Sequence, residues 1–76
     1  MWVRSQDGMN LIKAEVFQIH EDRLNNDWYI KALTTSCVMV IARYKTGSMA
    51  KKILTRVQSY CYQNGVFQMP PDEITK

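Results

Sequence analysis

The chain has 76 residues, of which 46% are hydrophobic and 22% are charged, with three glycines, two prolines and a formal net charge of +3. This composition excludes an intrinsically disordered chain and a collagen-like repeat, because the apolar fraction is that of a globular protein and glycine and proline are few. The length excludes a two-domain enzyme and predicts one small domain with little room for a deep pocket.

The first third of the chain predicts short strands. Residues 2–4 (WVR) favour a strand, and residues 6–8 (QDG) favour a turn in which the glycine takes a positive φ. Leu11 and Ile12 begin a returning strand, and residues 15–20 alternate with a period of two, so residues 10–20 can contain two strands. These two parts do not keep the same phase, so we expect a bulge or a bend at residues 13–15.

The strongest β signal lies in the middle of the chain. Residues 28–33 and 37–44 are dense in β-branched and aromatic residues, and the short polar segment 34–36 separates them. This pattern predicts a hairpin. Strict alternation divides the side chains of its second strand between two faces. One face has Val38, Val40, Ala42 and Tyr44. The opposite face has Cys37, Met39, Ile41 and Arg43.

After residue 44 the hydrophobic period becomes helical. Thr46 is the predicted N-cap of a helix over residues 47–63, and Asn64-Gly65 is the predicted stop. The apolar stripe that must face the sheet consists of Ala50, Ile53, Leu54, Val57 and Cys61. Residues 66–69 can return as a short edge strand, or they can simply pack Phe67 and Met69 onto the core, and two prolines end this segment.

Together these elements predict an α+β fold. We expect a bent, mostly antiparallel sheet of about five strands with one C-terminal helix packed across it. The domain spans residues 1–69, and residues 70–76 form a flexible, solvated tail.

Cysteine usage and hydropathy indicate where this domain resides. Cys37 and Cys61 have neither the paired spacing of a zinc site nor the density of a secreted disulfide scaffold. We therefore expect two buried thiols, with a disulfide as the alternative. No signal peptide and no stretch of the roughly 20 apolar residues of a membrane span is present. We expect a soluble, cytoplasmic protein with no membrane partner.

Residues that carry catalytic chemistry are sparse. His20 is the only histidine and is followed by Glu21 and Asp22, a grouping that could serve as a general base or a metal ligand. It lacks the convergent third and fourth ligands that zinc requires, so a solvated strand end is the preferred interpretation. No serine, cysteine or glycine pattern matches a nucleophile or phosphate-binding motif. We therefore expect no enzyme, no cofactor and no metal.

Basic residues suggest one binding surface. Residues 1–27 contain three basic and five acidic residues, whereas residues 28–71 contain six basic residues and no acidic one. Five of these cations could form a patch at the end of the hairpin and on the outer helix face: Arg43, Lys45, Lys51, Lys52 and Arg56. Such a patch could bind nucleic acid weakly and without sequence preference, or bind an acidic partner. The alternative is an ordinary solvated helix face.

Apolar residues suggest a second surface. A group of side chains that one helix would not cover consists of Val16, Met39, Ile41 and Tyr62. Either the sheet curls into a partial barrel that buries them, or they form an interface with a partner protein or a second copy. We therefore expect a non-enzymatic protein–protein interaction module, with weak nucleic-acid binding as the alternative.

The ends of the chain carry specific motifs. Residues 1–8 (MWVRSQDG), a Tyr-x-Thr before the helix that contains Ala50 and Leu54, and residues 67–70 (FQMP) together resemble a group of small proteins of phages and prophages in Firmicutes. The resemblance spans nearly the whole chain and implies a role in a mobile element and a location in the bacterial cytoplasm. That group typically has acidic residues after the threonine, where this chain has residues 47–49 (GSM), so no role of those acids is carried over.

Overall fold

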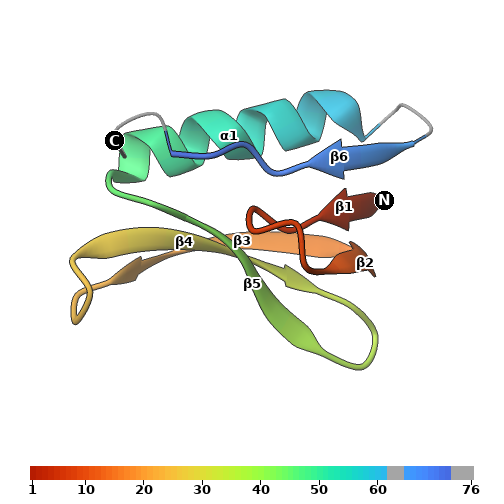
Figure 1. Cartoon of the computed structure of the whole chain (residues 1–76), viewed down its shortest axis with the longest axis horizontal. Coiled ribbons are helices and arrows are strands. Elements are labelled where there is room, and N and C mark those ends of the chain that lie inside the picture. Colours follow the sequence, from red (N-terminus) through yellow and green to blue (C-terminus); the bar gives the residue numbers. More distant parts are fainter. Residues whose placement is uncertain (62–64, 73–76) are drawn as a thin grey trace.

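The structure, a computed structural model, describes residues 1–61 and 65–72 and places one helix across two small sheets (Figure 1). In chain order the elements are β1 (Trp2–Arg4), β2 (Leu11–Lys13), β3 (Val16–Asp22), β4 (Asp27–Leu33), β5 (Val38–Tyr44), α1 (Gly47–Tyr60) and β6 (Val66–Gln68). This architecture confirms the predicted α+β class. Among the described residues, no helix has the length and apolar character that a membrane crossing requires.

The strands form two three-stranded sheets in the orders β2-β1-β6 and β3-β4-β5. All pairs are antiparallel except β1 and β6, which run parallel. The predicted edge strand at residues 66–69 is thereby confirmed, and its partner is the first strand of the chain. Figure 1 shows β6 lying beside α1, between the helix and β1.

The predicted irregularity at residues 13–15 is a bend through which the chain passes from one sheet to the other. Ala14 is buried at this point, and its amide donates to the carbonyl of Met1 in the first sheet, 2.8 Å away. The next amide, of Glu15, donates to the carbonyl of Leu33 in the second sheet at 2.9 Å. Residues 11–22 therefore contribute one strand to each sheet, and the β surface curls at the bend between the two strands.

Gln6 joins the two sheets a second time. Its amide donates to the carbonyl of Ile41 at 2.7 Å. Its side-chain oxygen accepts from the amide of Arg43 at 2.9 Å, and its Nε2 donates to the carbonyl of Arg43 at 3.1 Å. The side-chain amide thus pairs with β5 as the backbone of a neighbouring strand would.

A β-bulge in β5 changes which residues face the core. Ile30 pairs with Ala42 but Lys31 pairs with Val40, so Ile41 is the extra residue on β5. The prediction that Val38, Val40, Ala42 and Tyr44 share one face is therefore wrong. Ala42 and Tyr44 lie in the core, whereas Val38 and Val40 are exposed.

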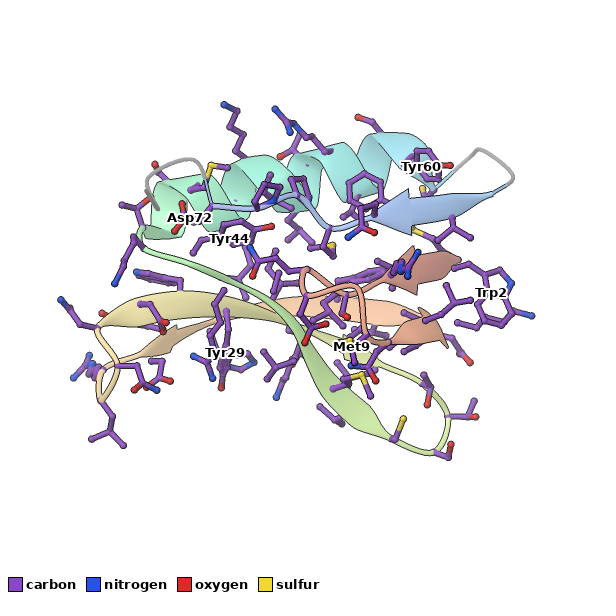
Figure 2. All side chains as sticks on the ribbon, viewed as in Figure 1. Trp2, Met9, Tyr29, Tyr44, Tyr60 and Asp72 are labelled. Atoms are coloured by element: carbon purple, nitrogen blue, oxygen red, sulfur yellow. The ribbon has the colours of Figure 1, made fainter. Side chains whose placement is uncertain are left out.

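Helix α1 contributes the central part of the core. Thr46 is its N-cap, as predicted, and its Oγ1 accepts from the amide of Met49 at 3.1 Å. The buried helical residues are Met49, Ala50, Ile53 and Val57, while Leu54 is half-buried. Figure 2 shows Tyr44 between the helix and the strands, where its side chain is buried.

Both cysteines are exposed, so the prediction of buried thiols is wrong. The helix ends at Tyr60, and Cys61 is the C-cap beyond the last turn that faces the strands. The predicted helical residues 62 and 63 lie outside the described residues. Cys37 lies in the turn between β4 and β5, where its amide donates to Thr34 Oγ1 at 3.0 Å.

The sequence predicts that a flexible tail begins at residue 70, but residues 70–72 are held against the domain. The carbonyl of Pro70 accepts from the hydroxyl of Tyr44 at 2.7 Å and from Nε2 of Gln6 at 3.1 Å. The carboxylate of Asp72 accepts from the amide of Lys45 at 2.7 Å. Burial raises the pKa of Tyr44 to about 12, which keeps its hydroxyl protonated as a donor.

Candidate interaction surfaces

Arg43 does not lie in the predicted basic patch. It belongs instead to an ion cluster on the outer face of β3-β4-β5. Its Nη1 is 3.0 Å from Asp22 Oδ2 and 3.1 Å from Asp27 Oδ1, and its guanidinium lies 5.2 Å from the ring centroid of Tyr29. Figure 2 shows Tyr29 projecting from this sheet on the side away from the helix. Two carboxylates compensate the charge of Arg43, so it is not available to a patch on the helix.

The same cluster shifts two pKa values. Hydrogen bonds from Asn25 and from Arg43 lower the pKa of Asp22. The hydrogen bond to Asp22 in turn raises the pKa of Arg43. His20 completes the cluster, because its ring stacks on Tyr29 with the centroids 5.5 Å apart. It is half-buried rather than a solvated strand end. Among residues 1–61 and 65–72, no group of three or more metal-ligating side chains could hold an ion.

The other four cations of the predicted patch are exposed on the helix side of the molecule. Lys52 and Arg56 are one helical turn apart on α1, with Lys51 beside them, and Lys45 immediately precedes the N-cap. The first turn of α1 contains no acidic residue. This arrangement is a smaller cationic surface than the sequence predicted.

The predicted apolar interface is only partly at the surface. Val16 is exposed, but Met39 packs against the core and Ile41 is only 2% exposed. Tyr62 lies outside the described residues. The bulge at Ile41 explains the difference, since it reverses the two faces of the first half of β5.

A different apolar row takes the place of Met39 and Ile41. The register of β3-β4-β5 aligns Val16 with Leu33 and Leu33 with Val38, and Val40 follows on the next row. Val38 is 59% exposed, and Val16 and Val40 are also exposed. We call Val16, Leu33, Val38 and Val40 the valine row. Strict alternation could not reveal this row, because residues 37–42 are apolar in both phases.

The outer face of β2-β1-β6 combines apolar and cationic residues, a feature that sequence reasoning missed. Its registers give two rows of side chains, Lys13–Trp2–Val66 and Leu11–Arg4–Gln68. The large apolar members are open to solvent, with Trp2 45% and Leu11 55% exposed. Figure 2 shows Trp2 projecting at one end of the molecule. A hollow of about 460 Å³ lies at this face, lined by Arg4, Gly8, Met9, Asn10, Leu11 and Val66.

The residues of the N-terminal motif that follow β1 form a turn. Ser5 Oγ donates to Asp7 Oδ1 at 2.6 Å and accepts from the amide of Asn10 at 3.1 Å. The hydrogen bond from Ser5, followed by one from the amide of Met9, lowers the pKa of Asp7. Gly8 has φ +76°, which a glycine adopts without strain.

The two terminal motifs contact each other. Gln68 Nε2 donates to the carbonyl of Ser5 at 2.9 Å, and the amide of Met69 donates to the carbonyl of Arg4 at 3.0 Å. The segments 1–8 and 67–70 therefore form one structural unit. Comparison with protein-family models, curated proteins and solved structures found no match.

Proposed function

We propose that the protein is a non-enzymatic protein–protein interaction module that associates through the edge of β5, as a phage-type accessory protein in the bacterial cytoplasm. The observation that carries this proposal is the valine row, an apolar stripe across all three strands of an open sheet. Contiguous exposed apolar residues commonly mark surfaces that another protein covers.

The backbone of β5 supports association by strand addition. This strand is last in the order β3-β4-β5, so no described strand pairs with its second edge at Val38–Val40. Thr34 and Cys37 form the hydrogen-bonded pair nearest the turn, with the Thr34 amide 2.9 Å from the Cys37 carbonyl. Because hydrogen-bonded and non-hydrogen-bonded pairs alternate, the backbone groups of Val38 and Val40 point to the open edge. Such an edge binds an added strand.

A second copy of the chain is the partner that we propose, since its own β5 has the same open edge. Antiparallel pairing of the two edges would join two three-stranded sheets and bring the two valine rows together. The average mass measured by multi-angle light scattering should therefore rise with protein concentration toward that of a dimer.

Val38→Lys is expected to shift this association to at least about tenfold higher concentration, because a lysine on an edge strand resists pairing. Leu24→Lys is the matched control, since Leu24 is also apolar and is 98% exposed in the turn between β3 and β4. Thermal unfolding of both variants verifies that they fold. A strict monomer at every concentration, or equal association of the Val38→Lys and wild-type proteins, would contradict the proposal.

Weak nucleic-acid binding is the second candidate function, and the observation that favours it is the exposed helix face with Lys51, Lys52 and Arg56. Labelled single- and double-stranded oligonucleotides should then bind at low salt and dissociate as salt is added, because phosphate contacts release counterions. Lys51→Glu combined with Lys52→Glu should abolish this binding. No binding at low salt, or binding that the double variant retains, would eliminate this candidate.

A further inference from the structure

We propose that the outer face of β2-β1-β6 is a second binding surface, which takes an extended peptide segment with acidic side chains beside apolar ones. Each of the two rows on this face contains one cation next to a large apolar side chain, with Lys13 beside Trp2 in one row and Arg4 beside Leu11 in the other. No acidic residue is among the six. The face is therefore both apolar and positive, and its complement is both apolar and negative.

Arg4 is pre-organised for a carboxylate. Its Nε donates to the carbonyl of Gly8 at 3.0 Å, and this is its one described side-chain hydrogen bond. The acceptor is itself fixed, because the amide of Gly8 donates to the carbonyl of Ser5 at 2.9 Å. The two terminal guanidinium nitrogens remain for a bidentate contact with a carboxylate, and less side-chain entropy is lost when such an anchored group binds.

The acidic residues closest in sequence to Arg4 and Lys13 are Asp7 and Glu15, and neither forms a described ion pair with them. The carboxylate of Asp7 is engaged by the hydroxyl of Ser5 and by the amide of Met9, at 2.6 Å and 2.9 Å. Glu15 lies beyond the bend at Ala14 and lines a separate hollow beside α1, together with Leu54. Arg4 and Lys13 thus present their charges next to apolar surface without a described ion pair.

The spacing of the two cations favours an extended peptide. Arg4 and Lys13 are diagonal neighbours across the β1–β2 pair, because Trp2 is opposite Lys13 and Arg4 is opposite Leu11. Diagonal neighbours in an antiparallel pair are about 7–8 Å apart. Alternate side chains of an extended peptide are roughly 7 Å apart and lie on one face. Carboxylates at positions i and i+2 can therefore meet Arg4 and Lys13, while apolar side chains near them contact Trp2, Leu11 and the hollow.

The test uses a short fluorescein-labelled peptide with capped ends, in which two aspartates alternate with leucine and phenylalanine. Its anisotropy is measured against wild-type protein at low salt, and a second peptide has asparagine at both aspartate positions. We expect the aspartate peptide to bind at least about tenfold more tightly than the asparagine peptide, the effect of losing charge-assisted hydrogen bonds.

Variants of the protein locate the site. Arg4→Gln and Lys13→Gln should each weaken binding of the aspartate peptide by about tenfold or more, and Lys13→Gln leaves the Arg4–Gly8 hydrogen bond in place. Lys51→Gln removes an equal charge from the exposed face of α1 and should leave the affinity unchanged. Val38→Lys should also bind normally, which separates this surface from the edge of β5. Circular dichroism verifies the fold of each variant.

Several results would overturn the proposal. These are no binding of the aspartate peptide, equal affinity for the asparagine peptide, or equal loss of binding in Lys51→Gln and Arg4→Gln. Single-stranded oligo-dT and vesicles with anionic lipids are the competing probes. Tighter binding of either probe than of the aspartate peptide, lost in Arg4→Gln, would assign the surface to a nucleic acid or a membrane instead.

Discussion

Replacing Ile53 by alanine is expected to lower the free energy of unfolding by about 2–5 kcal/mol, because the lost side chain leaves a cavity in a packed core. Ile53 is 0% exposed and lies in the middle of α1, which packs chiefly against β4. A loss of this size is a large share of the stability of a small domain. Urea denaturation followed by circular dichroism measures it.

Leu54 is the matched control on the same helix. It is half-buried, so Leu54→Ala removes the same number of carbon atoms from a site that solvent partly reaches already. We expect a clearly smaller loss for Leu54→Ala than for Ile53→Ala. Equal losses, or a change of only a few tenths of a kcal/mol for Ile53→Ala, would mean that α1 is not docked as described.

Replacing Gln6 by glutamate is expected to lower the free energy of unfolding by about 2–3 kcal/mol, although the two side chains have the same shape. The Gln6 side chain accepts from the amide of Arg43 and donates to the carbonyls of Arg43 and Pro70. A carboxylate keeps the acceptor but cannot donate, so it places a negative charge against two carbonyl oxygens. The same denaturation measurement checks this prediction.

Gln18→Glu is the matched control for this substitution. Gln18 is exposed on β3, and its oxygen is 3.2 Å from Nε2 of His20, a contact that a carboxylate can also make. We expect its effect on stability to lie within about 0.5 kcal/mol. If Gln6→Glu is as mild as this control, the side-chain hydrogen bonds of Gln6 do not contribute to holding the two sheets together.

Features set by neighbouring residues could be predicted from the sequence. The helix with its Thr46 cap, the hairpin and the bend after Lys13 all follow from local patterns of capping, β-branched residues and hydrophobic phase, and the structure contains each of them. These patterns act within a few residues, so the printed sequence contains the information that determines them.

Features set by distant residues could not be predicted. The bulge at Ile41 leaves no trace in the alternation, because the residues around it are apolar in both phases. The partners of Arg43 are Asp22 and Asp27, which only the three-strand register brings to it. The basic patch was overestimated for this reason, and Val38 and Val40 were placed on the same face of β5 as Ala42 and Tyr44 because the bulge was not foreseen.

The combined face around Trp2 and Arg4 was missed for a related reason. Trp2 and Leu11 fit the pattern of strand formers, but both side chains lie on the exposed face of β2-β1-β6. Which side of a three-residue strand faces the core is not encoded by its own alternation. The packing of Val3 and Met69 into the core decides it.

The parallel pairing of β1 with β6 has a consequence for biosynthesis. One edge of β1 pairs with residues 66–68, so β1 emerges from the ribosome long before the strand that completes its sheet. During translation β1 can pair with β2 alone, and the domain reaches its final form only after Met69 and Pro70 have left the exit tunnel. A nascent chain stalled before residue 66 would leave one edge of β1 open to pairing with other unfolded chains.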